Sequence, residues 1–204
     1  MAGSIPDSSS FHWNTPDSIL QPTREVLGSI DLDPCSNHGS RVNAQTNFVW
    51  PEQDGLLESW APYKTAYVNP PYGKVHVNPD TKELLLPKEF KDRKDSGADV
   101  SAFQSRDITD WHLKCQEFAE NGGTAIEVIP AAVNSVKGWH SIIFPSPAMG
   151  AFCFFRGRPH FVIDGRESST GTQEIAAVLW TKDKNMVQSF KKAFSKVGYV
   201  VRRI

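Results

Sequence analysis

The segment Tyr67–Lys74, "YVNPPYGK", combines residue types that can hold a planar amino group. Pro70 and Pro71 lack backbone N–H donors and fix φ, and Pro70 favours an extended conformation at Asn69. The Asn69 side chain and a proline carbonyl then form two rigid acceptors, which suit the exocyclic NH2 of a nucleobase. Tyr72 can stack on the same flat ring. The alternative from these residues alone is an ordinary turn with Tyr72 in the core.

The elements that must position this segment alternate between strands and helices. We predict buried strands in "SIDLDPCSN", "KTAYVNPPY" and "TAIEVIP", each closed by a proline. A helix is predicted to run through Ser29, with Thr15 as its N-cap, Pro16 at its first position and Asp17 as an acid in its first turn. Pro22 is the point at which this helix would kink or break.

Later elements continue the pattern. A helix is predicted over Ile108 to Asn121 and a shorter helical stretch near Val133 to Ile143. Strands in "MGAFCFFRG" and "EIAAVLWT", a last helix in "DKNMVQSFKKAFSKVG", and "YVVRRI" complete the chain. This order predicts a single α/β sandwich domain over residues 1–204, with a mostly parallel sheet and an antiparallel edge strand. Ligands are then expected at the carboxyl ends of the strands.

Residues 74–106 stand apart as a polar, charged and weakly periodic segment. The segment is longer than an ordinary loop in a compact domain, and such loops are typically functional or disordered. We therefore expect an inserted polar loop directly after the Asn69–Tyr72 segment.

Composition restricts the class of protein. Apolar residues make up 39% and charged residues 22% of the 204 residues, and no apolar run approaches the roughly 20 residues that span a bilayer. The polar N-terminus "MAGSIPDSSS" lacks the features of a signal peptide. Cys35, Cys115 and Cys153 show no CxxC spacing, so we expect neither a disulfide framework nor a metal site, and a reducing, cytoplasmic location.

A net charge of −1 argues against a protein that coats nucleic acid generally, but not against a local basic face. Positive residues gather late in the chain, where they form either a phosphate-binding face or a solvated lysine-rich helix: Arg156, Arg158, Lys182, Lys184, Lys191, Lys192, Lys196, Arg202 and Arg203.

Five short motifs together resemble the small phage-type DNA N6-adenine methyltransferases, a Dam-like family that uses S-adenosylmethionine. They occur in the family's order as "WNTP" (Trp13–Pro16), "DLDPCSN" (Asp31–Asn37), "DGLLESW" (Asp54–Trp60), "YVNPPYG" (Tyr67–Gly73) and "FRGRPHF" (Phe155–Phe161). The match covers most of the chain outside residues 74–106. The resemblance implies a Rossmann-like methyltransferase fold that transfers a methyl group to adenine in DNA, in a bacterial host cell if the protein is of phage origin.

The resemblance also implies roles for cofactor-binding residues. Thr15 and Pro16 match a motif at the methionine end of the cofactor, and Asp33 and Pro34 match an acid-proline pair whose carboxylate receives the cofactor's amino group. Asp54 matches an acid that faces the adenine amino group, and the following Gly55 and Leu56 give the ring apolar cover. A cationic ligand favours carboxylates, and adenine favours an apolar slot with a polar edge. The alternatives are a turn capped by Asp33 and a tight surface turn at Asp54 and Gly55.

The sequence departs from the family's pattern near Asp33. A GxGxxG loop is absent, and only Gly39 follows in the expected region. No acid lies between Asp33 and Asp54, in an interval that is short for a full helix and strand. Either a βα unit is abbreviated or Asp54 itself binds the ribose.

Asn69, Pro70, Pro71 and Tyr72 match the catalytic loop of the family. Acceptance of the amine hydrogens by Asn69 and Pro70 localises the nitrogen lone pair for direct attack on the methyl carbon, without a cysteine nucleophile. The target adenine is expected to flip out of the duplex into this site.

DNA contacts are expected from Lys74, Arg156 and Arg158. The alternatives are a structural ion pair for Arg158 and a surface position without a function for Lys74. Residues 74–106 are expected to touch DNA or to close over the site. Methylation of cytosine N4, methylation of RNA or of a protein glutamine, and a non-catalytic nucleic-acid-binding module remain the alternative functions.

Overall fold

The computed structural model describes residues 14–133, 137–163, 166–167 and 174–203. Trp13, the N-terminal "MAGSIPDSSS" segment and residues 134–136 of the predicted helical stretch lie outside the described residues, as does the final Ile204.

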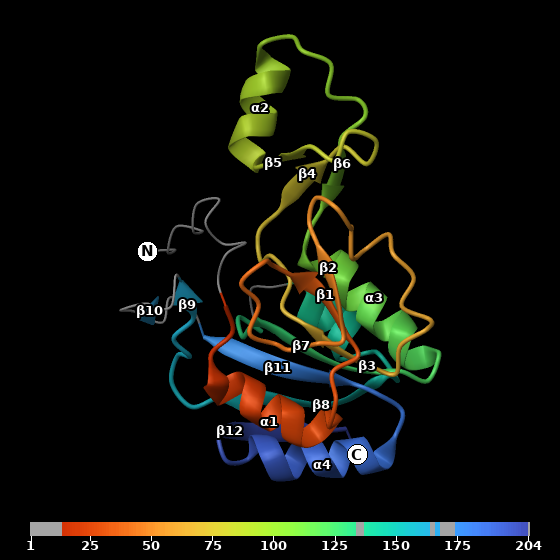
Figure 1. Ribbon diagram of the computed structural model, residues 1–204, viewed down its shortest axis with the longest axis vertical. Helices are drawn as coiled ribbons and strands as arrows, with labels where there is room; N and C mark the ends of the chain where they lie inside the picture. The colour runs from red at the N-terminus through yellow and green to blue at the C-terminus, as the bar shows by residue number, and fades with distance from the viewer. Residues whose placement is uncertain (1–13, 134–136, 164–165, 168–173, 204) are drawn as a thin grey trace.

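A mixed sheet of seven strands forms the centre of the molecule (Figure 1). The first four neighbours, β2, β1, β3 and β7, pair in parallel, and β7, β11, β8 and β12 pair antiparallel. In sheet order the strands are β2 (Thr46–Val49), β1 (Leu32–Ser36), β3 (Thr65–Val68), β7 (Thr124–Pro130), β11 (Ile175–Trp180), β8 (Met149–Phe155) and β12 (Gly198–Arg202). All the predicted strands are present. Antiparallel pairing extends beyond the one expected edge strand because β11 inserts between β7 and β8.

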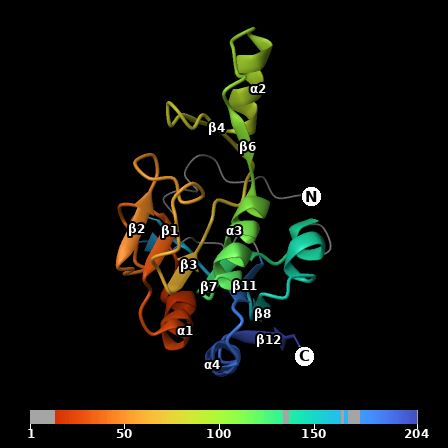
Figure 2. The same ribbon diagram turned by 90° about the vertical axis from the view of Figure 1, so that its right-hand side faces the viewer.

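Helices cover both faces of this sheet (Figure 2). Helices α1 (Asp17–Leu27) and α4 (Lys184–Phe194) lie on one face, and α3 (Ile108–Glu120) and the short η2 (Trp139–Ile143) lie on the other. Neighbouring strand residues point to opposite faces, so Tyr67 packs with α1 and α4 whereas Val68 packs with α3. The two faces form separate cores, and the carboxyl ends of β1, β2, β3 and β7 meet at one edge.

Two local predictions were wrong in detail. Pro16, not Thr15, is the N-cap of α1, because the Thr15 hydroxyl bonds to the Tyr67 hydroxyl at 2.8 Å instead of a helix N–H; the helix then continues through Pro22 to Leu27. Strand β1 continues past Asp33 and Pro34 to Ser36, with a register irregularity against β2 between Asp33 and Ser36. A proline fits within a strand at such an irregularity, since one ladder hydrogen bond is absent there.

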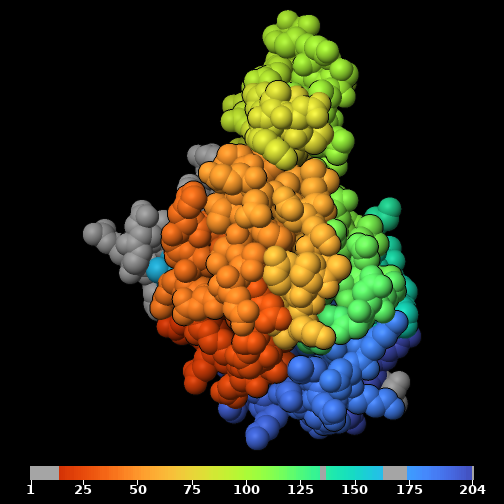
Figure 3. Space-filling view, turned by 45° about the vertical axis from the view of Figure 1, so that its right-hand side comes forward, coloured from red at the N-terminus to blue at the C-terminus, as the bar shows by residue number. Residues whose placement is uncertain are grey.

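Residues 74–106 form a folded lobe that protrudes from the body of the molecule (Figure 3). The lobe contains a small antiparallel sheet in the order β5 (Leu84–Leu85), β4 (Val75–Val77) and β6 (Gln104–Arg106), with helix α2 (Pro87–Asp95) beside it. His76 stacks on Phe90 with ring centroids 3.7 Å apart, and Phe90 meets Phe103 edge-on. A charged segment that was expected to be a polar loop therefore has a small core of its own.

A short hairpin, β9 (Val162–Ile163) and β10 (Arg166–Glu167), completes the described elements. No helix in the described part of the chain is long and apolar enough to cross a membrane.

Candidate active site

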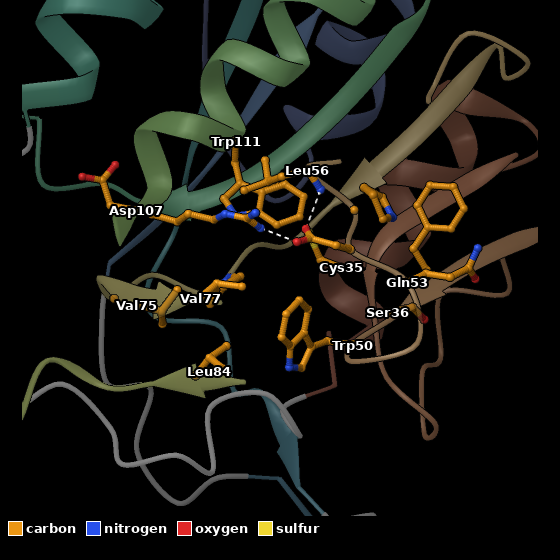
Figure 4. A pocket seen from close by; sticks show the side chains of 17 residues that line it. Cys35, Ser36, Trp50, Gln53, Leu56, Val75, Val77, Leu84, Asp107 and Trp111 are labelled. Atoms are coloured by element: carbon orange, nitrogen blue, oxygen red, sulfur yellow. Dashed lines mark hydrogen bonds and ion pairs between the residues drawn. The ribbon is translucent and has the colours of Figure 1, made fainter. Parts of the chain in front are cut away.

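A pocket opens at the carboxyl ends of β1, β2 and β3 (Figure 4). The chain passes from β1 to β2 on one side and places β3 on the other side of β1, so the pocket lies where the strand order reverses. Open α/β sheets bind ligands at such a point. The pocket and the open solvent space at its mouth together amount to about 610 Å³. Its lining residues are Pro34, Cys35, Ser36, Phe48, Trp50, Gln53, Asp54, Gly55, Leu56, Pro71, Gly73, Val75, Val77, Leu84, Arg106, Asp107 and Trp111.

The walls of the pocket are mainly apolar and come from two parts of the chain. The body supplies aromatic and aliphatic side chains, among them Phe48, Leu56 and Trp111. The lobe supplies Val75, Val77 and Leu84 from the sheet face that Figure 4 shows turned toward the pocket. A flat apolar ring therefore fits this space better than a charged ligand does.

Gly55 is needed for the close approach of two pocket walls. A Cβ on Gly55 would lie 2.0 Å from the Pro34 carbonyl oxygen and 3.0 Å from the Trp111 ring. The Gly55 carbonyl also accepts a buried hydrogen bond from Trp60 Nε1 at 2.9 Å. Only a residue without a side chain lets the Asp54–Leu56 turn lie against the end of β1.

Asp54 supplies the polar edge of the pocket and is 5% exposed. Its Oδ1 accepts from the Leu56 backbone N–H at 3.1 Å, and its Oδ2 forms an ion pair with Arg106 Nη1, as the dashed lines in Figure 4 mark. The backbone does form a turn after Asp54, with Leu57 and Glu58 N–H donating to the Asp54 carbonyl, but the Asp54 side chain is buried. Arg106 was missed at the sequence level, because nothing distinguishes it from the other basic residues of the lobe.

Asp33 lies beside the pocket, directly before the lining residue Pro34, and is 2% exposed. Its carboxylate accepts from the Cys35 backbone N–H at 3.2 Å and from the Ser40 hydroxyl at 3.1 Å. Burial raises the pKa of Asp33 to about 6, although these hydrogen bonds oppose the shift. A carboxylate that is poorly solvated in this way gains from a cationic partner.

The N-terminal motif is held at the same edge of the sheet. Thr15 and Pro16 are buried, and Asn14 pairs with Val162 of β9 through two backbone hydrogen bonds of 2.8 and 2.9 Å. The bond from Thr15 to Tyr67 attaches the motif to β3, just before Asn69. Neither Thr15 nor Pro16 lines the described pocket.

The Asn69–Tyr72 loop follows β3 and is partly inside the pocket wall. Pro71 and Gly73 line the pocket, whereas Pro70 is buried and Asn69 and Tyr72 are half-buried outside its lining. The Tyr72 hydroxyl donates to Asn69 Oδ1 at 3.0 Å. This bond orients the Asn69 amide, and its oxygen retains a second lone pair for another donor.

A buried polar cluster beneath this loop was also missed. Glu127 lies beside Val68 in the register of β7 and β3 and is fully buried. Its carboxylate bonds to His112 Nδ1 and accepts from Trp180 Nε1, both at 2.8 Å. Burial, and then the charge of Glu127, raise the pKa of Tyr72 well above its usual value. The acid inside the apolar strand "TAIEVIP" was the available signal, because a buried acid requires partners.

The three cationic candidates do not converge on the pocket. Arg158 forms an exposed ion pair with Glu174 at 2.6 Å, which is the structural alternative considered for it. Arg156 lies over the Tyr199 ring at 5.4 Å from its centroid and donates to the Ser195 carbonyl. Both follow β8, which is separated from β3 by β7 and β11. Lys74 is exposed at the base of the lobe.

The cysteines are poorly suited to act as nucleophiles, because burial disfavours their thiolate form. Burial, followed by the charges of Asp33 and Glu127, raises the pKa of the Cys35 thiol well above its usual value. Cys115 and Cys153 are buried free thiols. Within the described ranges, no group of three or more His, Cys, Asp or Glu side chains could hold a metal ion.

Comparison with known proteins identifies the family. A search of curated proteins finds no match to the chain. The family model described as DNA N-6-adenine-methyltransferase (Dam) matches residues 3–193 of the 204 residues, a range that includes every pocket residue named above. The chain therefore belongs to the Dam family of DNA N-6-adenine-methyltransferases and methylates adenine in DNA.

Proposed function

We propose that the chain carries out this reaction with S-adenosylmethionine, on an adenine flipped out of the duplex and held by the Asn69–Tyr72 loop. Methyltransferases of this family normally use S-adenosylmethionine, which supplies an electrophilic methyl group on a sulfonium sulfur when bound. The observation that carries the proposal is the position of the pocket: the loop follows β3 where the strand order reverses, and Pro71 and Gly73 line the pocket.

The residues present fit this cofactor. The apolar slot with Asp54 at its edge suits adenine, and Gly55 and Leu56 cover the ring. The buried Asp33 carboxylate suits the cofactor's ammonium group, and Pro34 connects Asp33 to the slot. Thr15 and Pro16 are proposed for the methionine end, because Thr15 is bonded to Tyr67 on the neighbouring strand.

The arrangement of strands supports a Rossmann-like methyltransferase fold. Strands β2, β1, β3 and β7 are parallel neighbours, helices cover both faces, and the pocket is at the reversal point. In the absence of a GxGxxG loop, the backbone of residues 34–36 and the close approach of Gly55 to Pro34 are proposed to form the wall that faces the cofactor. Between Asp33 and Asp54 the chain forms β2 directly after β1, with no helix between the two strands. This supports an abbreviated βα unit rather than ribose binding by Asp54.

The loop residues do the chemical work by holding the target amine. Asn69 Oδ1 and the Pro70 carbonyl accept its two hydrogens, which localises the nitrogen lone pair toward the methyl group. The bond from Tyr72 keeps the Asn69 oxygen in place before the substrate arrives. Pro70 and Pro71 keep the backbone rigid, and the Tyr72 ring replaces part of the stacking lost on flipping. Asn69 and Pro70 would hold the amine facing the methyl group that bound S-adenosylmethionine would supply, with the thioether as the leaving group, and the methylated amine would give up its extra proton to solvent.

The DNA is proposed to lie along the edge from which the lobe protrudes. Lys74 at the base of the lobe contributes a phosphate contact, and the lobe contributes sequence choice. Arg156 and Arg158 follow β8 at the same edge and supply further phosphate contacts, Arg158 after exchange of Glu174 for phosphate.

The test combines product analysis with two asparagine variants. The wild-type protein is incubated with DNA and S-adenosylmethionine, and the nucleosides are analysed by mass spectrometry; N6-methyladenine is expected. Asn69→Ala should lower the rate by about 100-fold or more while cofactor affinity is unchanged, because one preorganised acceptor is lost. Asn185→Ala, on the exposed first turn of α4, is the matched control. N4-methylcytosine as the product, or a fully active Asn69→Ala variant, would contradict the proposal.

A further inference from the structure

The lobe contributes a charged residue to the wall of the pocket in the body. Arg106 is the last residue of β6, where it pairs with Val75 of β4, and both residues line the pocket. Its side chain is 10% exposed, and that of its partner Asp54 is 5% exposed. Two charges are therefore held out of water at the polar edge of an apolar slot.

Stability alone does not explain this ion pair. Removing two charges from water costs about as much free energy as their attraction returns, so a buried pair adds little to stability. At the edge of a pocket, however, the pair has unused hydrogen-bonding capacity. Arginine has five N–H donors and the bond to Asp54 engages one, while each carboxylate oxygen has two lone pairs. The pair thus presents donors directly beside acceptors.

On the basis of the proposed function, we propose that Arg106 recognises the adenine ring of the cofactor, together with Asp54. Adenine carries a donor, the N6 amine, beside an acceptor, the N1 nitrogen. Asp54 as an acceptor and Arg106 as a donor are complementary to that edge. Hypoxanthine has the opposite order, a carbonyl oxygen beside an N1–H. Its carbonyl oxygen would face the Asp54 acceptor, and its N1–H would face the Arg106 donor. Arg106 is therefore the residue that reads N1.

The apolar surroundings make this contact selective. Val75, Val77 and Trp111 also line the pocket and offer no hydrogen-bond acceptor from their side chains. The lining carboxylate of Asp107 already accepts from the Thr109 backbone N–H at 2.7 Å. When a ring with C–H at position 1 enters, an arginine N–H is desolvated without an acceptor. An unsatisfied buried donor on a charged group lowers affinity by about tenfold or more.

The test changes one atom of the ligand and leaves the protein unchanged. Binding of S-adenosylhomocysteine and of its 1-deaza analogue, in which C–H replaces N1, is measured by isothermal titration calorimetry. The wild-type protein should bind the 1-deaza analogue about tenfold or more weakly. The S-inosylhomocysteine analogue should bind more weakly still, because both members of the pair then meet a like group.

Two substitutions complete the comparison. Arg106→Met should bind the parent ligand more weakly and should bind the parent and the 1-deaza analogue equally, because the donor is gone. Arg93→Met is the matched control: Arg93 is also an ion-paired arginine of the lobe, with Glu83 at 2.6 Å, but it does not line the pocket. This control should keep the wild-type ratio of affinities. The melting temperature of each variant is recorded with it.

Each outcome has a definite meaning. Equal binding of parent and 1-deaza ligands by the wild-type protein overturns the inference even if Arg106→Met fails to fold. Retained discrimination in a folded Arg106→Met variant also overturns it. Absence of binding to S-adenosylhomocysteine itself overturns the proposed function and the inference together, so the two failures are distinguishable.

Discussion

At the scale of single residues, the chemistry of the site depends on polar groups that are largely withdrawn from water. Asp33, Asp54 and Glu127 are all nearly or fully buried at the carboxyl edge of the sheet. Each has a different partner set: backbone and serine donors, an arginine, or a histidine and a tryptophan. Because water no longer satisfies these side chains, each depends on its protein partners for its hydrogen bonds.

Asp33 predicts the pH dependence of stability. Its pKa is raised from 3.8 to about 6 in the folded chain, so the folded state binds a proton more tightly than the unfolded state does. This contribution to stability is fully present below pH 3.8 and is lost as the pH rises through about 6. A raised pKa of this size corresponds to about 3 kcal/mol. Denaturant titrations of wild type and Asp33→Asn from pH 4 to pH 8 measure this contribution. The free energy of unfolding of the wild type, relative to that of Asp33→Asn, should fall as the pH rises through about 6. A difference independent of pH would contradict the assignment.

Substitution of Gly55 by alanine is expected to damage the pocket. Gly55→Ala places a methyl group within 2.0 Å of the Pro34 carbonyl oxygen, so the two walls must separate. We expect a loss of about 1–3 kcal/mol in the free energy of unfolding, together with loss of cofactor affinity. Gly39→Ala is the control for stability, because its new Cβ meets its nearest neighbours at an ordinary 3.5 Å. Thermal unfolding with and without S-adenosylhomocysteine gives both quantities. An unchanged ligand-induced shift in Gly55→Ala would argue against the close approach.

At the scale of elements, the lobe is both a wall of the pocket and an extension beyond it. Its sheet faces the pocket with Val75, Val77, Leu84 and Arg106, whereas α2 is exposed. Deletion of residues 74–106 would therefore open the pocket and cannot test sequence choice alone. Substitutions on α2 separate the two roles.

The exposed lysines of α2 predict a loss of DNA affinity without a loss of cofactor affinity. Lys88 and Lys94 are exposed, whereas Lys91 is paired with Asp95 at 2.7 Å and Arg93 with Glu83. In the variant Lys88→Ala/Lys94→Ala we expect weaker DNA binding and a salt dependence reduced by about one to two counterions. Fluorescence anisotropy at several salt concentrations measures both. Unchanged DNA binding would remove the lobe from the DNA surface.

Much of the fold was predictable because periodicity and prolines mark buried strands. "TAYV", "TAIEVIP" and the helix from Ile108 are found as predicted, since each has one clearly buried pattern and a strong terminator. The fold of the lobe was not predictable, because its core depends on contacts such as His76 with Phe90 that have no periodic signal. Thr15 was misassigned as a cap because its true partner, Tyr67, is distant in the sequence.

The site was partly predictable for the same reason. Pro34, Asp54, Gly55, Leu56 and Pro71 line one pocket, and the roles that their motifs imply stay predictions. The ion pair of Asp54 with Arg106 and the cluster around Glu127 were not foreseen, because each joins segments whose contact depends on the folded topology. Contacts of this kind cannot be predicted from the neighbouring sequence.

At the scale of the whole molecule, the lobe lies at one end and α4 lies at the opposite end (Figure 1). The pocket lies against the lobe, which supplies part of its lining. The late basic residues are not all far from α4, because Arg156 donates to the carbonyl of Ser195, the C-cap of α4. Lys191 and Lys192 belong to the last turn of that helix, at the end of the molecule away from the lobe. A positive charge contributes strongly to DNA affinity only within about a Debye length of the phosphates.

The position of α4 at the end opposite the lobe predicts that its lysines contribute less to DNA binding than the lysines of α2 do. Lys191→Ala/Lys192→Ala should change DNA affinity by less than about twofold at 0.15 M salt, because a charge screened over this distance contributes little. The measurement is the same anisotropy titration as for the α2 variant, with equal removal of charge. A loss comparable to that of the α2 variant would mean that DNA approaches the molecule from the end that carries α4.

The shared wall between lobe and pocket has a consequence for repeated turnover. On the proposed function, Val75 and Arg106 of the lobe form part of the wall around S-adenosylhomocysteine, so a duplex held by the lobe would restrict the exit of the spent cofactor on that side. Exchange of the used methyl donor then requires release of the DNA. The enzyme should accordingly act distributively: on a substrate with two target sites, singly modified molecules should accumulate before doubly modified ones, whereas a processive enzyme would produce the latter from the first encounter.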